Sequence, residues 1–286
     1  AVQYAKYLGK SDVKILISSL EHESTLMAAK ALSQNIQVDF IEALPNGEVD
    51  LTYLKLCLAQ SSPYDLVSVM AVNNETCVIQ PIEQVIGLCS QYKIPFHIDC
   101  SQALGRIDLK LNSLIHPQQI GYFTFSGHKL GALKGIGFLA VVGEGRLLWP
   151  ILHGKQQKQL RGGTENPLLV HILGKVIEAI SNNEAGFPEY LLQYRNDFEF
   201  ELKRSIAGLH IHGETSRRIR NTSYIGFDGV DGDTILMNLD LAGICASSGS
   251  ACTSGSIDPS HVLLAMGINK SMARSSIRLS SGFETT

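Results

Sequence analysis

A regular alternation between short β-branched apolar runs and segments of helical periodicity constrains this chain most. Five runs have the length and composition of buried strands, and they cover residues 13–17, 38–41, 66–70, 96–98 and 122–125. Between them, residues 23–34, 51–59 and 81–92 repeat apolar side chains at helical spacing. This order is typical of an α/β protein with a mostly parallel sheet and helices on its faces. Ligands of such sheets gather at the carboxyl ends of the strands.

A change in composition predicts a second domain. Residues 181–186 are polar, contain a glycine and precede Pro188, which is typical of a domain boundary. Beyond them the pattern predicts helices at 188–207 and 232–238, a strand at 223–227 and a Ser/Gly-rich stretch at 246–256. We therefore expect a large domain over residues 1–182 and a smaller α+β domain over residues 183–286.

Composition excludes several classes of function. Hydrophobic residues make up 44 % of the chain and charged residues 18 %, which argues against disorder. A net charge of −3 gives no electrostatic footprint for nucleic acid or an anionic membrane. The longest apolar runs, such as 136–142, fall short of the roughly 18 to 20 residues that cross a bilayer. The six cysteines are scattered without zinc-type spacing, so we expect no metal site, reduced thiols and a cytoplasmic protein.

The motif Ser126-Gly127-His128-Lys129 directly follows the strand predicted at 122–125. A lysine acts as a Schiff-base nucleophile when its amine is held near an electrophile and loses its proton, and the end of a strand provides such a place. Ser126 and His128 can donate hydrogen bonds to a phosphate. The alternative is an ordinary solvated loop lysine.

Asp99 lies at the end of another predicted strand, within the stretch from His97 to Gln102. A carboxylate there, backed by Gln102, suits the protonated pyridine nitrogen of pyridoxal phosphate. Alternatively, Asp99 caps a helix that begins near Gln102.

Two further motifs follow strands. Asn74 lies in the run Asn-Asn-Glu-Thr after strand 66–70, where its amide would orient a cofactor oxygen, although a plain polar turn is the alternative. His22 follows strand 13–17, where its imidazole would stack on an aromatic ring, or else serve only as a helix cap.

The second domain contributes a cysteine and an arginine. Cys252 lies in the sequence SSGSACTS at 247–254, a polar loop without the packing that makes most cysteines inert. Arg278 lies in the run Ser-Ile-Arg-Leu-Ser and suits bidentate capture of a carboxylate, or an ordinary salt bridge.

Together and in this order, these motifs are far more specific than any one of them. The sequence resembles the cysteine desulfurases of the class V aminotransferase group, which are pyridoxal-phosphate enzymes. It is most similar to the NifS/IscS branch, because the loop SSGSACTS is unaltered. The resemblance covers residues 1–286 and implies a mostly parallel, seven-stranded-type large domain with a smaller α+β C-terminal domain.

The resemblance implies a role at the cofactor for five residues. Lys129 would bind pyridoxal phosphate as a Schiff base and then act as general base and acid. Asp99 would hold the pyridine nitrogen. His22 would stack on the ring and shuttle a proton near the substrate thiol. Gln102 and Asn74 would contact the ring oxygen, and Asn74 would also contact substrate.

Five more residues complete the implied site. Ser126 and His128 would bind the cofactor phosphate. Thr164, in a stretch similar to the family motif R-S/G-G-T-E-N, would reach the phosphate in the neighbouring subunit, which implies a homodimer. Cys252 would receive the sulfur, and Arg278 would bind the carboxylate of L-cysteine.

The sequence also departs from the family pattern. The G-A-T-E segment that normally precedes the start of this chain is absent, and so is the closing helix after Thr286, so both ends are expected to be incomplete. Cys77 stands where relatives carry a glycine, and the residues at 155–159 replace a glycine-rich stretch. The missing phosphate contact is expected to weaken binding of the cofactor.

The implied activity is the conversion of L-cysteine to L-alanine with a persulfide on Cys252. The sulfur would pass to an acceptor protein or an iron-sulfur scaffold, in the cytoplasm or an organelle. Two alternatives stay open: a transaminase or cysteine/selenocysteine lyase, which needs no mobile cysteine, and a truncated, non-catalytic scaffold.

Overall fold

The computed structural model describes residues 12–33, 36–61, 63–109, 119–143, 154–182, 187–249 and 258–282. The chain divides into two compact units. The large unit comprises residues 1–41, 51–71 and 81–185, and the small unit comprises residues 42–50, 72–80 and 186–286. Two short segments from the first third of the chain thus belong to the small unit, which the sequence pattern did not anticipate.

The large unit contains a mostly parallel sheet, as the alternating pattern predicts. Its strands are β1 (Lys14–Ser18), β2 (Gln37–Ile41), β3 (Leu66–Met70), β4 (Phe96–Asp99), β5 (Gly121–Ser126) and β6 (Gly137–Val142). They are ordered β2-β1-β3-β4-β5-β6, and only the pair β5–β6 is antiparallel. The described residues therefore form six strands, where the resemblance implies seven. The alternating pattern did not predict β6, which begins at Gly137 and forms a hairpin with β5.

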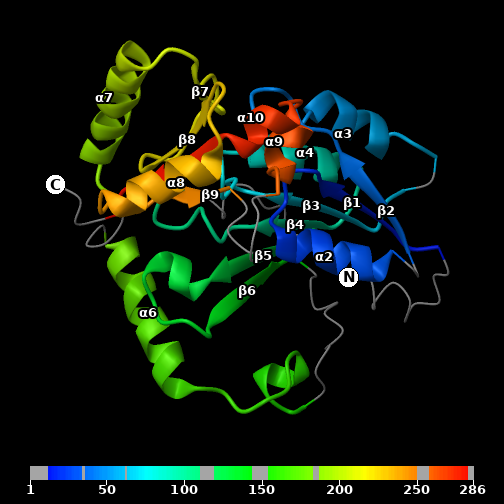
Figure 1. Ribbon diagram of the computed structural model, residues 1–286. Helices are drawn as coiled ribbons and strands as arrows, with labels where there is room; N and C mark the ends of the chain where they lie inside the picture. Colours follow the sequence, from blue (N-terminus) through cyan, green and yellow to red (C-terminus); the bar gives the residue numbers. More distant parts are fainter. Residues whose placement is uncertain are drawn as a thin grey trace. The chain divides into compact units, whose positions relative to one another are not determined.

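The large unit also contains four α-helices, three between its strands along the chain and one after β6. They are α2 (Glu23–Leu32), α3 (Leu51–Leu58), α4 (Ile82–Gln91) and α6 (Pro167–Ser181). Helix α2 packs on β1 through Ala29, Leu26 and Leu32, which contact Ile15 and its neighbours in one apolar cluster. Helices α3 and α4 lie side by side (Figure 1).

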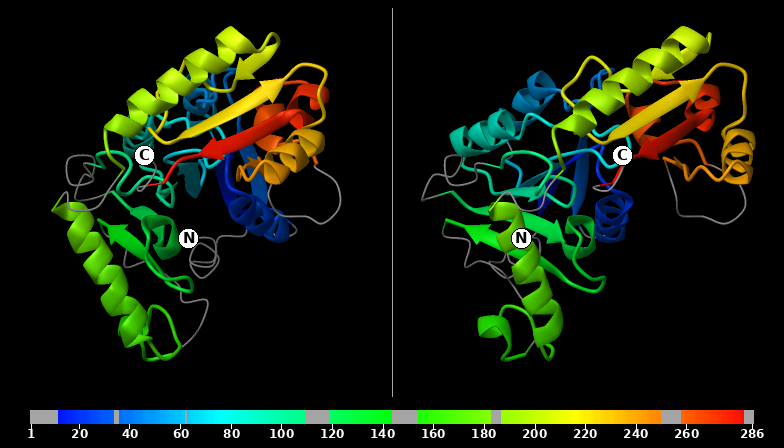
Figure 2. Two further views of the ribbon diagram at one scale, coloured as in Figure 1. Left: turned by 60° about the vertical axis from the view of Figure 1, so that its left-hand side comes forward. Right: turned by 90° about the vertical axis from the view of Figure 1, so that its left-hand side faces the viewer.

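The small unit contains an antiparallel sheet of the order β7-β8-β10-β9. Its strands are β7 (Leu209–Ile211), β8 (Thr222–Phe227), β9 (Ser247–Ser248) and β10 (Ser276–Ser280). Figure 2 shows β8 and β10 running side by side in opposite directions. The helices are α7 (Tyr190–Ser205), α8 (Gly232–Leu241), α9 (His261–Ala265) and α10 (Lys270–Arg274). The sequence predicted α7, α8 and β8 but not the shorter elements.

The segments 42–50 and 72–80 are tied into the small unit by long-range contacts. The hydroxyl of Ser216 donates to the carbonyl of Asn46 over 3.0 Å, and Val78 forms an antiparallel bridge with Arg218. Cys77, which precedes Val78 in the second segment, is buried with a φ of 61°. Because glycine adopts positive φ without steric cost, this backbone conformation suits the glycine that the family resemblance leads us to expect at position 77.

Candidate active site

The turn that carries Lys129 is anchored by apolar neighbours. It is a short 3-10 helix, Gly127–Leu130, that follows β5. Leu130 is buried against Leu173 of α6, whereas His128 and Lys129 are exposed. A Cβ atom at Gly127 would lie 2.8 Å from the carbonyl oxygen of Ile136, the residue before β6, so only glycine allows this close approach. The turn therefore presents Lys129 from a rigid base.

The surroundings of His128 suit an anion. Its Nδ1 lies 3.0 Å from the hydroxyl oxygen of Ser126. His128 is exposed, but partial loss of its hydration lowers its pKa below the usual value, and the nearby ammonium groups of Lys129 and Lys134 lower it further. The imidazole therefore stays uncharged at neutral pH while two cations lie near it. A hydroxyl, an imidazole and two ammonium groups form a donor set that fits a phosphate.

Asp99 ends strand β4, as predicted. Its neighbours in the sheet are Met70 of β3 and Thr124 of β5. The side-chain Oδ1 accepts a 2.9 Å hydrogen bond from the backbone N–H of Ser101. Residues 101–106 form turns, so Asp99 does not cap a helix at Gln102, and that alternative is wrong. Gln102 is half-buried in these turns.

A buried carboxyl group, Glu21, lies near Asp99 and was missed by the sequence analysis. Glu21 is fully buried, and its Oε1 accepts a hydrogen bond from the backbone N–H of Met70. Burial, together with the negative charge of Asp99, raises the pKa of Glu21 to about 8. The signal available in the sequence was a carboxylate three residues after an apolar strand, next to His22.

The imidazole of His22 has a defined orientation. His22 is the N-cap of α2, and its Nδ1 accepts the backbone N–H of Ser24 over 3.1 Å. The proton of the uncharged ring is therefore assigned to Nε2. His22 is exposed, and so is Thr164, which precedes α6. His22 thus caps α2 through Nδ1, which leaves its Nε2 for other contacts, and its role at a cofactor stays a prediction.

A half-buried histidine lies two residues before Asp99 on the same strand. His97 of β4 contacts the hydroxyl of Ser68 on β3 over 2.8 Å and that of Thr124 on β5 over 3.0 Å. Burial lowers the pKa of His97, so the ring stays uncharged. These contacts fix the three central strands against one another just before their carboxyl ends.

Asn74 and Arg278 belong to the small unit. One guanidinium nitrogen of Arg278, Nη1, donates to the backbone carbonyl oxygen of Asn74 over 2.7 Å. Arg278 lies on β10 between its cross-strand partners Tyr224 and Ser247. The structure thus brings together two residues that the sequence analysis selected separately. Cys252 lies outside the described residues.

The described cysteines make poor nucleophiles, with one exposed exception. Cys57, Cys77, Cys89 and Cys100 are buried, Cys245 is exposed, and all five are free thiols. Burial raises the pKa of Cys89 to about 12, and burial next to Asp99 raises the pKa of Cys100 as well. Such thiols stay protonated and unreactive at neutral pH.

Among the described residues, no three His, Cys, Asp or Glu side chains gather in a group suited to a metal ion. No helix in the same part of the chain combines the length and the apolar character that a bilayer crossing requires.

The family model for aminotransferase class V matches residues 1–286. The chain belongs to this family. A cysteine desulfurase of Nostoc sp. (strain PCC 7120 / SAG 25.82 / UTEX 2576) is 38 % identical over 269 residues, which are 93 % of this chain and 65 % of that protein. The cysteine desulfurase IscS of Rickettsia bellii (strain OSU 85-389) is 33 % identical over 286 residues, or 99 % of this chain and 68 % of that protein. The chain thus spans about two thirds of the length of these curated relatives.

A solved structure supports the same placement. The X-ray structure of a NifS-like protein from Rickettsia africae ESF-5 superimposes with a TM-score of 0.83 at 28 % identity, covering 99 % of this chain and 75 % of that one. Resemblance to the NifS/IscS branch of the class V aminotransferases is therefore confirmed, and so is the α/β fold. The family is one of pyridoxal-phosphate enzymes.

Proposed function

We propose that this chain is part of a pyridoxal-phosphate-dependent cysteine desulfurase that converts L-cysteine to L-alanine and leaves a persulfide on Cys252. One observation carries the proposal. Asp99 and the turn with Lys129 leave adjacent parallel strands, β4 and β5, at the same carboxyl edge of the sheet. Ligands of α/β sheets bind at this edge. Relatives named cysteine desulfurase support the choice of reaction.

The residues at this edge fit pyridoxal phosphate. An exposed amine at Lys129 suits its aldehyde, the carboxyl group of Asp99 suits its pyridine nitrogen, and Ser126 with His128 suits its phosphate. His22 would stack on the ring, and Gln102 and Asn74 would bind the ring oxygen. Bound there, the cofactor supplies an electron sink conjugated to the α-carbon of the substrate.

Three residues perform the chemistry in this proposal. The amine of Lys129 takes the α-proton of cysteine and later returns a proton. The thiolate of Cys252 forms a bond to the cysteine sulfur as the carbon–sulfur bond breaks, and the electron pair of that bond stays on carbon. His22 carries the proton of the substrate thiol. Protonation of that carbon gives alanine, so a thiol and cysteine yield a persulfide and alanine without an external oxidant.

Substrate and partners follow from the same assignment. Arg278 binds the carboxylate of cysteine, and the bond to the Asn74 carbonyl fixes one of its five N–H donors. We assign Thr164 to the phosphate bound by a second copy, so the enzyme works as a homodimer. Because the sulfur stays bound to Cys252, it passes to an acceptor protein such as an iron-sulfur scaffold, and we place the enzyme in the cytoplasm.

The lysine assignment is tested by the visible absorption of the purified protein, with borohydride reduction and mass mapping of the modified lysine. Lys129→Ala should abolish the absorption of the lysine-bound Schiff base and the modified peptide. Lys175→Ala is the matched control, because Lys175 is an exposed lysine of the same unit that pairs with Glu178 over 2.7 Å. Cofactor still bound covalently in Lys129→Ala would show that the assignment is wrong.

The cysteine assignment is tested by measuring alanine and sulfide. Cys252→Ser should retain the cofactor absorption and lose both products, because serine cannot accept the sulfur. Cys245→Ser is the control, since Cys245 is an exposed thiol only seven residues earlier and should keep full turnover. Undiminished desulfuration in Cys252→Ser would favour a lyase. A wild-type protein that binds no cofactor would favour a non-catalytic scaffold.

A further inference from the structure

A buried carboxyl group in the small unit has no part in the mechanism proposed above. Glu75 is 2 % exposed and lies in the segment 72–80. Its backbone is fixed by Asn73, whose side-chain oxygen accepts the backbone N–H groups of Glu75 and Thr76, each over 2.9 Å. The carboxyl group is therefore held by a rigid turn, and a buried carboxyl needs hydrogen-bond donors.

Two hydroxyl groups supply those donors. The Ser260 side chain accepts the backbone N–H of Leu263 at the start of α9, so its own proton is free to donate to Oε2 of Glu75. The Tyr224 hydroxyl is hydrogen-bonded to both Glu75 and Ser260. Burial and the charge of Glu75 raise the pKa of Tyr224 above its usual value, so the phenol keeps its proton and donates it.

The same cluster touches the chain on the other side of Cys252. Gly249 is buried at the end of β9, and a Cβ atom there would collide with the Tyr224 hydroxyl oxygen and with Oε2 of Glu75. Gly249 and Ser260 thus contact the same carboxyl group. The ten residues between them, 250–259, include Cys252. One carboxyl group therefore joins the two ends of the segment that carries this cysteine.

We propose that Glu75, with Tyr224 and Ser260, is a positioning residue that clasps the two ends of the segment 250–259 and so places Cys252 for sulfur transfer. The inference rests on the proposed desulfurase function. Its physical basis is that a segment whose ends are held together has fewer conformations to search. The loss of conformational entropy then occurs on folding and does not add to the barrier of the reaction. Glu75 touches no reacting atom in this proposal.

Glu75 could instead affect the enzyme through substrate binding. Asn74 precedes Glu75 and accepts the hydrogen bond from Arg278, so a shift of Glu75 would also displace the proposed carboxylate ligand. The two roles predict different kinetics. A loop clasp changes the rate at which bound cysteine gives up its sulfur, whereas a displaced Arg278 raises the KM for cysteine.

The test compares Glu75→Ala and Tyr224→Phe in the enzyme loaded with pyridoxal phosphate. Mass spectrometry follows persulfide formation on Cys252 in a single turnover at saturating L-cysteine, and absorption and thermal unfolding report cofactor binding and folding. We expect Glu75→Ala to slow persulfide formation about ten- to a hundred-fold with KM and absorption unchanged, as for loss of a hydrogen bond to a charged group. Tyr224→Phe removes one hydroxyl and should slow it about three- to ten-fold.

Two control variants complete the design. Glu75→Gln keeps an oxygen that accepts the Ser260 hydroxyl, so it should stay within about three-fold of wild type. Glu214→Ala removes an exposed carboxylate of the same unit, which pairs only with Lys203 among the described ion pairs, and should leave the rate unchanged.

Two results would overturn the clasp: wild-type persulfide formation in a folded Glu75→Ala protein, or a loss that appears in KM alone. If Glu75→Ala fails to fold, Tyr224→Phe decides by the same two criteria. Failure of the wild-type enzyme to form any persulfide would instead refute the desulfurase function, and the clasp with it.

Discussion

Two buried glutamates, one in each unit, show opposite shifts in pKa. Glu21 of the large unit is fully buried, and its pKa is raised to about 8. Glu199 of the small unit is 7 % exposed, and its pKa is lowered below the usual value. Nearly equal burial thus gives opposite charge states at neutral pH, so the partners of each carboxyl group must decide the difference.

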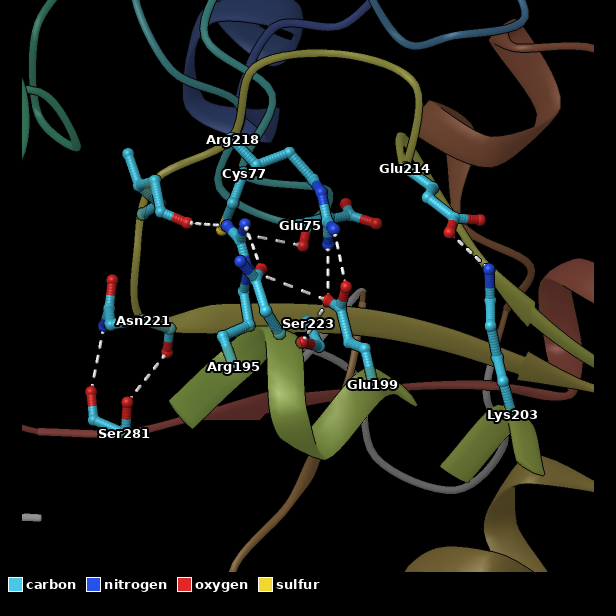
Figure 3. Close-up of polar contacts among 12 residues, drawn as sticks. Glu75, Cys77, Arg195, Glu199, Lys203, Glu214, Arg218, Asn221, Ser223 and Ser281 are labelled. Carbon is cyan, nitrogen blue, oxygen red and sulfur yellow. Dashed lines mark hydrogen bonds and ion pairs between the residues drawn. The ribbon is translucent and has the colours of Figure 1, made fainter. Parts of the chain in front are cut away.

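Glu199 lies among cationic and hydroxyl donors. Burial alone would raise its pKa, but hydrogen bonds from Arg218 and Ser223 and the charges of Arg218 and Arg195 outweigh burial. Arg218 donates to both carboxylate oxygens, each over 2.7 Å, and Ser223 donates over 2.6 Å (Figure 3). The carboxylate therefore stays ionised inside the protein.

Glu21 instead lies near a second acidic group, Asp99, and accepts a backbone N–H. The two carboxyl groups thus differ in whether cationic groups of the same unit lie beside them. The small unit neutralises Glu199 within its own fold, whereas the carboxyl edge of the large sheet concentrates acidic groups. A positively charged ligand group, such as a protonated pyridine nitrogen, would relieve that concentration.

The largest expected effect comes from removing the charge of Glu199. Glu199→Gln should lower the free energy of unfolding by about 3–5 kcal/mol, because Arg218 is left buried without its carboxylate. Glu201→Gln is the control, because Glu201 pairs with Arg204 at an exposed site of the same helix. Urea denaturation at pH 7 measures both variants. A loss below about 1 kcal/mol in Glu199→Gln would show that the pair is not effectively buried.

Glu21 should show the opposite dependence on pH. Its pKa rises from 4.5 to about 8 on folding, so between these values the folded state binds more protons and the free energy of unfolding falls as pH rises. Glu21→Gln removes this penalty, while its amide oxygen still accepts the N–H of Met70. The variant should therefore be more stable than wild type by about 2–4 kcal/mol at pH 9.

Denaturation of the cofactor-free protein at pH 5 and pH 9 checks this expectation. At pH 5 the two proteins should differ by less than about 1 kcal/mol, because Glu21 is then protonated when folded. A difference of equal size at both pH values would mean that Glu21 is not protonated at neutral pH. Asp99→Asn sharpens the comparison. Removing the charge of Asp99 should lower the pKa of Glu21, so the fall in the free energy of unfolding should end at a lower pH than in the wild type.

Local sequence patterns predict the large unit better than the small one. The sequence predicted β1 to β5 from their apolar runs, and the polar motifs at their ends were found because parallel strands share a carboxyl edge. The buried role of Glu75 was not found, because its partner Ser260 lies 185 residues away. The attachment of Asn46 to Ser216 likewise spans 170 residues. Periodicity carries no information about such contacts.

The smallest effect should come from the exposed ion pair of Lys203 and Glu214 (Figure 3). The side chains are 39 % and 48 % exposed, so water screens their attraction, and ordering two flexible side chains offsets most of it. Glu214→Gln should lower the free energy of unfolding by less than about 1 kcal/mol, and raising the salt concentration should shrink even that loss. Urea denaturation at low and high salt measures both. A loss that approached that of Glu199→Gln and persisted in salt would contradict the contrast between exposed and buried carboxylates. Burial would then not be the property that makes the Glu199 pair strong.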